Sequence, residues 1–173
     1  MKKKVKIFGY GSLLCEESLL RTAPCAVDII PCKLFGFFRI FNAKCSRFCE
    51  VNGKNVAALN IEKSEYNQYL NGICFEVNQE DLDSLIQREQ GYELIKIDLV
   101  DYNNNQFTAF TFRYPHFEAE FEYLFNSKPQ KDYLNLCYQG AQSFGEQFLR
   151  EFLETTFIGE KNLNFFKKEL DLE

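Results

Sequence analysis

The chain has no tryptophan, one histidine and only four prolines among 173 residues. It also has no hydrophobic run near the roughly 20 residues of a membrane-spanning helix. Tracts rich in Ser, Gly or Pro are missing too, while 46% of the residues are hydrophobic and 26% are charged. This composition excludes collagen-like, fibrous and disordered chains. We therefore expect a globular protein with no membrane partner.

The chain also has fewer positive than negative side chains. The 20 Lys and Arg side chains face 25 Asp and Glu side chains, which gives a net charge of −5 with the histidine neutral. Such a chain has no general basic field that could neutralise phosphates. We expect no nucleic-acid partner.

Paired cysteine motifs are absent from the sequence. An odd number of scattered cysteines favours free thiols over a disulfide framework, and so predicts a cytoplasmic location. The lysines at positions 2–4 precede an apolar stretch that Lys6 and two glycines interrupt, which is not the core of a signal peptide. The seven cysteines are Cys15, Cys25, Cys32, Cys45, Cys49, Cys74 and Cys137.

No linker, repeat or low-complexity tract divides the chain, so we expect a single domain over residues 1–173. Residue patterns predict strands over 5–10, 34–42, 55–61, 71–77, 93–102 and 106–114, with three asparagines at 103–105 as a hairpin turn. Helical periodicity predicts helices over 16–20, 78–90, 130–144 and 147–157. Because the helices are fewer and come late, the pattern favours an α+β fold with a strongly curved or barrel-like sheet.

Glu89 is the first candidate functional residue. Leu82, Leu85, Ile86 and Glu89 follow the spacing i, i+3, i+4, i+7, which predicts that the carboxylate lies on the buried stripe of its helix. Burial and the negative end of the helix would both raise the pKa of Glu89 toward neutrality, the range that suits a general base. The alternative is a glutamate that ends the helix, reaches water and pairs with Arg88.

The second candidate is the segment Phe8-Gly9-Tyr10-Gly11-Ser12-Leu13, which we call the glycine turn. It follows the first predicted strand, and its backbone amides can point into one concavity that binds carboxylates or phosphates. The turn has neither the lysine nor the spacing of a Walker loop and is not G-x-G-x-x-G, which argues against a nucleotide. The alternative is an ordinary turn between a strand and a helix.

Two further side chains could contribute. Pro129 leads a helix that carries Tyr133 in its first turns, where the hydroxyl can reach a substrate carboxylate or Glu89, or the ring can simply fill the core. Arg39 and Asn42, on the strand predicted over 34–42, would face either a cavity or solvent.

In this order, the segments resemble the γ-glutamylcyclotransferase superfamily, which includes ChaC and AIG2-like proteins. Its members carry Y-G-S-[LN] after the first strand, a catalytic glutamate in the middle of the chain and P-x-x-x-Y at the start of a late helix. The matching segments here are Tyr10-Gly11-Ser12-Leu13, Glu89 in Arg88-Glu89-Gln90-Gly91-Tyr92, and Pro129 to Tyr133. The resemblance implies a small mixed β-barrel of about six strands flanked by helices.

The resemblance also implies a reaction without metal or cofactor. The substrate would be a γ-glutamyl amide whose α-amine attacks its own γ-carbonyl, releasing 5-oxoproline and an amine. Glu89 would be the catalytic base and acid, and the substrate-binding residues would be Tyr10, Gly11, Ser12, Leu13, Tyr133 and Arg39. Glutathione-specific members of the ChaC type follow the loop with an aliphatic residue and a tryptophan, whereas this chain has Leu14-Cys15. The leaving amine is therefore left open.

Three other interpretations stay open at this point. The first is a module on the same fold that binds a carboxylate or a partner without turnover. The second is thiol or metal chemistry at Cys45 and Cys49, whose spacing without neighbouring Cys or His suits zinc poorly. The third pairs His116 with a nucleophile, for which no nucleophile-elbow motif is present. The oligomeric state stays open between monomer and homodimer.

Overall fold

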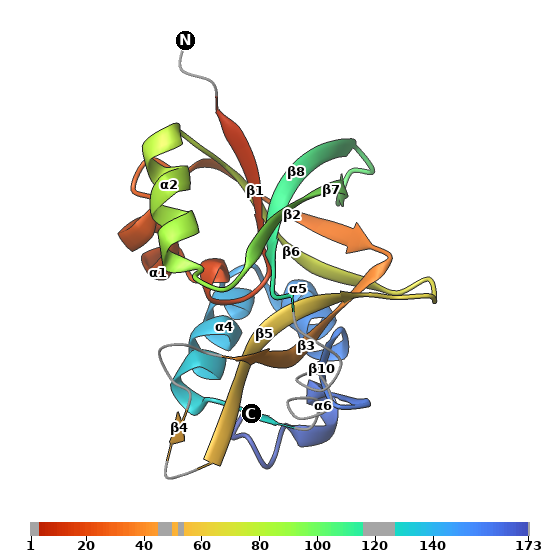
Figure 1. Cartoon of the computed structure of the whole chain (residues 1–173). Helices are drawn as coiled ribbons and strands as arrows, with labels where there is room; N and C mark the ends of the chain where they lie inside the picture. Colours follow the sequence, from red (N-terminus) through yellow and green to blue (C-terminus); the bar gives the residue numbers. More distant parts are fainter. Residues whose placement is uncertain (1–3, 45–49, 52–53, 116–126, 173) are drawn as a thin grey trace.

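The centre of the computed structural model is a closed barrel of five strands (Figure 1). The structure describes residues 4–44, 50–51, 54–115 and 127–172, and side chains at 50–51 and 54–56 are left out of the description. Neighbouring barrel strands are antiparallel except β1 and β8, which close the barrel as a parallel pair. Around the barrel the order is β1 (Val5–Gly9), β6 (Tyr69–Val77), β2 (Val27–Phe35), β7 (Glu93–Asp101) and β8 (Gln106–Arg113).

A second, six-stranded sheet lies beside the barrel. Its two long strands, β3 (Phe37–Lys44) and β5 (Lys54–Lys63), are antiparallel, and β10 (Thr156–Ile158) adds to β3 in parallel. The short strands β4 (Glu50–Val51), β9 (Lys128–Pro129) and β11 (Lys161–Asn162) extend this sheet. The sheet therefore joins the middle of the chain to its last part.

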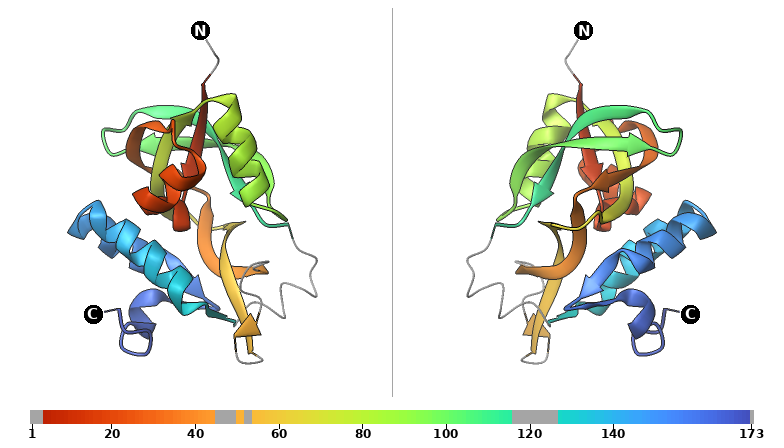
Figure 2. Two further views of the ribbon diagram at one scale, coloured as in Figure 1. Left: turned by 90° about the vertical axis from the view of Figure 1, so that its left-hand side faces the viewer. Right: turned by 90° about the vertical axis from the view of Figure 1, so that its right-hand side faces the viewer.

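Helices flank both parts, as Figures 1 and 2 show. The 3₁₀ turn η1 (Ser12–Leu14), α1 (Glu16–Thr22) and α2 (Gln79–Arg88) lie beside the barrel, whereas α4 (Lys131–Ser143), α5 (Glu146–Glu154) and α6 (Leu163–Phe166) lie next to the second sheet. One cluster of buried apolar side chains runs from Ile7 and Phe75 in the barrel to Phe152 and Leu163. The single domain over residues 1–173 stays a prediction.

The predicted α+β class and the barrel flanked by helices are confirmed, with five strands in the barrel. The single strand predicted over 34–42 is wrong, because Gly36 takes a φ of +77° and turns the chain between β2 and β3. Strand β2 was not predicted, since Pro31 lacks the N–H that a ladder needs. In the structure Pro31 lies opposite Ile73 of β6, while β7 pairs with β2 only at Cys32 and Lys33.

The other boundaries follow the local sequence closely. Asn78 caps α2 by accepting a hydrogen bond from the amide of Asp81, as its position predicted. The asparagine hairpin is also confirmed, and Asp101 accepts hydrogen bonds there from the amides of Asn103 and Asn105. The helix predicted to reach residue 157 is wrong at its end, because Thr156 begins β10. The sequence did not predict the helix α6 or the short strands β4, β9, β10 and β11.

A close helix contact holds the chain just after β1. A Cβ added to Gly140 in α4 would lie 2.5 Å from the backbone nitrogen of Cys15 and 2.5 Å from the carbonyl carbon of Leu14. Only a residue without a side chain lets α4 approach η1 this closely. The glycine turn is therefore held between the barrel and α4.

We expect Gly140→Ala to destabilise the protein although alanine is the better helix former by about 1 kcal/mol. The new methyl group meets main-chain atoms that cannot move aside, and overpacking of this kind costs about 1–3 kcal/mol. Urea denaturation measures the free energy of unfolding, with the exposed Gln142→Ala on the same helix as the control. A Gly140→Ala protein as stable as the control would contradict the close packing.

Candidate functional site

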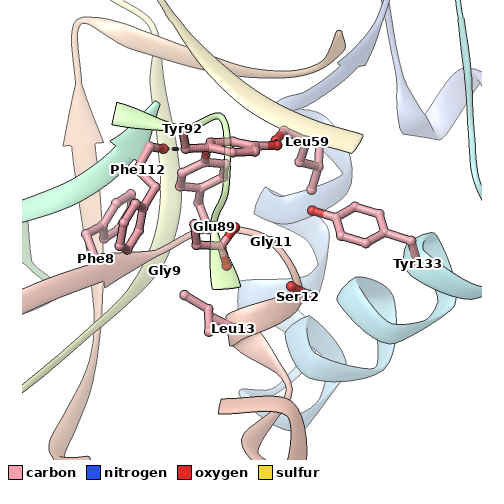
Figure 3. Close-up of a pocket in the computed structure, with 11 residues that line it drawn as sticks. Phe8, Gly9, Gly11, Ser12, Leu13, Leu59, Glu89, Tyr92, Phe112 and Tyr133 are labelled. Atoms are coloured by element: carbon pink, nitrogen blue, oxygen red, sulfur yellow. Dashed lines mark hydrogen bonds between the residues drawn. The ribbon is translucent and has the colours of Figure 1, made fainter. Parts of the chain in front are cut away.

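One pocket gathers residues that are far apart in the sequence (Figure 3). It opens where the glycine turn meets the end of α2, the barrel strand β8 and the start of α4, and it holds about 320 Å³ including its open mouth. Glu89 and five of the six predicted substrate-binding residues line it. The full lining is Phe8, Gly9, Tyr10, Gly11, Ser12, Leu13, Leu59, Glu89, Tyr92, Phe112 and Tyr133.

The glycine turn is shaped by its own hydrogen bonds and by its leucines. The amide of Leu14 donates to the carbonyl of Gly11 at 2.9 Å, and the amide of Cys15 donates to the carbonyl of Ser12 at 3.3 Å. Leu13 and Leu14 are buried and anchor the turn in the core. The Leu14 amide is the first that donates a hydrogen bond within the turn. The amides of Gly11, Ser12 and Leu13 come before it, and all three residues line the pocket.

Glu89 enters the pocket because α2 ends there. Its amide still donates to the carbonyl of Leu85 at 2.9 Å, but its backbone has left the helical conformation. Figure 3 shows the carboxylate directed toward the glycine turn, and the side chain is 20% exposed. The predicted buried stripe is wrong at Ile86, which is 47% exposed, so the helix end and not the stripe positions Glu89. The raised pKa of Glu89 stays a prediction.

Arg88 joins α1, α2 and the glycine turn. Its Nε lies 3.4 Å from Oε1 of Glu89, as the alternative interpretation of Glu89 proposed. The terminal nitrogens donate to four oxygens at 2.8–2.9 Å: the Ser18 carbonyl, Thr22 Oγ1, Ser12 Oγ and Ser18 Oγ. The sequence prediction gave Arg88 no such role, because neighbouring segments supply these acceptors.

Tyr133 faces the glycine turn from α4. The side chain of Gln130 caps the helix by accepting a hydrogen bond from the Tyr133 amide at 2.5 Å, which sets the tyrosine in the first turn. A Cβ added to Gly11 would lie 2.8 Å from the Tyr133 hydroxyl oxygen, so a larger residue there would displace that hydroxyl. Burial raises the pKa of Tyr133 well above its ordinary value, and the hydroxyl keeps its proton at neutral pH.

Aromatic side chains make the rest of the wall. The Tyr10 hydroxyl donates to the carbonyl of Phe112 at 2.6 Å, and burial raises the pKa of Tyr10 well above its ordinary value. The Tyr92 hydroxyl donates to the carbonyl of Leu59 at 2.7 Å, and its ring packs edge to face with Tyr114. The sequence did not predict Tyr92, Leu59 and Phe112 as site residues, and it marked Phe8 only as the first residue of the glycine turn. Among these residues, a motif marked only Tyr92, which lies three residues after Glu89 in Arg88-Glu89-Gln90-Gly91-Tyr92.

Arg39 does not lie where the sequence prediction placed it. The side chain is fully buried beneath the glycine turn and is not among the residues that line the pocket. Burial lowers the pKa of Arg39 to about 9, so the guanidinium is still charged at neutral pH. Direct contact between Arg39 and a ligand, as predicted, does not fit this placement.

The predictions on thiols and metals concern partly described residues. Cys45, Cys49 and His116 lie outside the described residues, and the five other cysteines are free thiols. In the ranges that the structure describes, no group of three or more His, Cys, Asp or Glu side chains is arranged to hold a metal ion. No helix in those ranges is long and apolar enough to cross a bilayer.

Comparison with known proteins gives matches to solved structures. No protein-family model matches the sequence, and no curated protein sequence matches it. An uncharacterized protein from Homo sapiens superposes with a TM-score of 0.71 at 19% identity, over 87% of each chain. A structure named gamma-glutamyl cyclotransferase gives 0.71 at 16% identity, over 99% of this chain and 100% of the other. A yeast gamma-glutamyl cyclotransferase specific to glutathione gives 0.63 at 15%, over 94% and 96%. The chain has the fold of these γ-glutamyl cyclotransferase structures.

The contacts of Arg88 lead to a prediction about stability. We expect Arg88→Met to lower the free energy of unfolding by about 1–3 kcal/mol, because hydroxyl and carbonyl acceptors lose a charged donor. Arg21→Met is the control, since the exposed pair of Arg21 with Glu17 should change stability by less than about 0.5 kcal/mol. Equal effects of the two substitutions in chemical denaturation would contradict the bridging role of Arg88.

Proposed function

We propose that the protein is a γ-glutamylcyclotransferase that releases 5-oxoproline and an amine from a γ-glutamyl amide. The observation that carries the proposal is the single pocket that Glu89, the glycine turn and Tyr133 line together (Figure 3). Structures named gamma-glutamyl cyclotransferase share the fold. The pocket therefore combines a carboxylate base with backbone donors for an anionic group.

The proposed reaction takes place within the substrate. The α-amine nitrogen bonds to the γ-carbonyl carbon, the bond from that carbon to the leaving nitrogen breaks, and one proton passes from the attacking to the leaving nitrogen. Neither water nor a protein nucleophile takes part. Because the nucleophile and the carbonyl belong to one molecule, a folded substrate gains an effective concentration of about 10⁵ M or more. The protein must therefore mainly hold the glutamyl chain bent and move the proton.

Glu89 is the proton carrier in this proposal. An α-amine has a reference pKa near about 8, so it is mostly protonated at neutral pH and must lose a proton before it attacks. That first proton goes to solvent; when the neutral amine attacks, the carboxylate beside it accepts a second proton from the new ring nitrogen and returns it to the leaving nitrogen. The Arg88 Nε lies 3.4 Å from Oε1 of Glu89, so a cation stands beside the proposed proton carrier.

The glycine turn and Tyr133 hold the substrate. The amides of Gly11, Ser12 and Leu13 bind the α-carboxylate, which orients the amine toward Glu89. Tyr133, whose hydroxyl stays protonated, donates a hydrogen bond to the substrate or to Glu89. The apolar wall of Phe8, Leu59 and Phe112 lowers the local dielectric constant and strengthens these contacts.

The proposal defines the glutamyl half of the substrate and leaves the amine half open. The yeast structure is named as specific to glutathione. The present chain has Leu14-Cys15 after the glycine turn, where glutathione-specific members of the ChaC type carry an aliphatic residue and a tryptophan. Incubation with a panel of γ-glutamyl amino acids, amines and peptides, with detection of 5-oxoproline, tests the proposal and identifies the amine. Binding of 5-oxoproline without release from any panel member would favour a module that only binds.

Glu89→Gln preserves the shape of the side chain but cannot carry the proton. We expect kcat to fall by roughly 10²-fold to 10⁴-fold, the usual contribution of general acid–base catalysis. Steady-state release of 5-oxoproline measures the effect, and the exposed Glu93→Gln serves as the control. A Glu89→Gln enzyme that keeps wild-type turnover would remove the proposed mechanism.

Tyr133→Phe keeps the ring that packs edge to face against Phe41 and removes the hydroxyl group. The loss of one hydrogen bond to a charged or reacting group should lower kcat/KM by about 10-fold to 100-fold. Tyr138→Phe on the same helix is the matched control, because the Tyr138 hydroxyl donates to the carbonyl of Leu172 and does not line the pocket. Similar kinetics for the two variants would argue against a role of the Tyr133 hydroxyl.

A further inference from the structure

Arg39 is a buried cation that the proposed reaction does not use directly. It lies on β3, has no exposed surface and stacks on the ring of Phe152, with 4.2 Å between the guanidinium carbon and the ring centre. Buried arginines are rare unless they are paired. This one therefore needs partners that replace water.

Its partners in the described residues are neutral oxygens. A guanidinium has five N–H groups, and the contacts here are enough to occupy all of them. No carboxylate is among these hydrogen-bond acceptors. They are Thr156 Oγ1 for Nε (2.7 Å), the carbonyls of Tyr10 and Asn71 for Nη1 (2.9 Å each), and Asn71 Oδ1 (2.8 Å), Thr155 Oγ1 (3.1 Å) and the Phe152 carbonyl (3.4 Å) for Nη2.

The contact with Tyr10 fixes a peptide unit of the glycine turn. The Tyr10 carbonyl and the Gly11 amide belong to the same peptide group, and in a trans peptide the C=O and the N–H point to opposite sides. The described residues contain no cis peptide bond. Because the carbonyl points to the guanidinium, the Gly11 N–H points away from it. Gly11 lines the pocket and Arg39 does not, which is the arrangement expected for an N–H on the pocket side.

The charge of Arg39 acts in the same direction as its geometry. A guanidinium beside the carbonyl oxygen polarises the peptide and makes the N–H on the far side a better donor. Since neutral acceptors leave the positive charge of Arg39 uncompensated, its field reaches the pocket through one peptide group. An anion at the Gly11 amide is favoured by both effects.

We infer that Arg39 is a positioning residue, which orients the Tyr10–Gly11 peptide so that the Gly11 amide binds the carboxylate of the pocket ligand. This inference rests on the proposed function, because it takes the ligand to be a glutamyl or 5-oxoproline carboxylate. The arginine is held in turn by Thr155, Thr156 and Asn71, whose amide group donates to the Phe148 carbonyl at 2.8 Å. A lysine has three donors on one atom and cannot span these acceptors.

The test compares binding of 5-oxoproline with binding of its carboxamide, which has the same ring but no charge. We expect Arg39→Lys to weaken the binding of 5-oxoproline by about tenfold or more, as for the loss of a charged hydrogen bond, and that of the carboxamide by less than about threefold. Titrations followed by amide NMR give both affinities, and the Gly11 signal reports on the contact itself. Leu153→Ala, which shortens a buried side chain of α5 and removes none of the hydrogen-bond acceptors of Arg39, controls for lost stability and should preserve the ratio of the two affinities.

An Arg39→Lys protein that keeps the wild-type ratio of affinities would overturn the inference, as would a wild-type protein that does not prefer 5-oxoproline. If Arg39→Lys does not fold, Thr156→Val replaces it, because valine has the shape of threonine and removes the acceptor of Nε, together with the hydrogen bond from the Thr156 hydroxyl to the Phe152 carbonyl. Its ratio should fall in the same direction, and an unchanged ratio again opposes the inference. Failure of the proposed function is seen separately, as 5-oxoproline binding without 5-oxoproline release.

Discussion

The site depends on the restraint of one short turn after the first strand. Arg39 donates to the Tyr10 carbonyl, Arg88 at the end of α2 donates to the Ser12 hydroxyl, and Gly140 lets α4 pack against the main chain at Leu14 and Cys15. Without these contacts, three consecutive amides would face solvent in many orientations. With them, the donors are fixed before a ligand arrives, and the cost of orienting them has been met during folding.

The two arginines support the turn in different electrostatic settings. Arg88 is partly exposed and lies beside Glu89, so its charge is shared with a carboxylate and with water. Arg39 is fully buried among neutral oxygens, and the loss of hydration lowers its pKa to about 9. Desolvation of such an ion costs several kcal/mol, which packing of the core must offset. A cost of this size is consistent with a residue that serves the site more than the stability of the fold.

The sequence predicted elements whose signals are local. The Asn78 cap, the hairpin at 103–105 and the alternating strands depend on neighbouring residues, and the cap, the hairpin and every predicted strand except 34–42 are present. Strand β2 was missed because the tolerance of Pro31 depends on which partner strand ends beside it. The position of Arg39 was missed for a similar reason. Its hydrogen-bond acceptors come from segments up to 117 residues away, and no local sequence pattern indicates such a partner.

The parallel pairing of β1 with β8 has a consequence for the newly made chain. Synthesis completes the glycine turn early, but the strand that closes the barrel follows about a hundred residues later, and Thr155 and Thr156 later still. Contacts of such long sequence separation form slowly. A nascent polypeptide on the ribosome therefore carries the reactive parts well before it has the frame that aligns them. Under the proposed function, ligand recognition is therefore a property of the completely folded chain and arises in the last steps of folding.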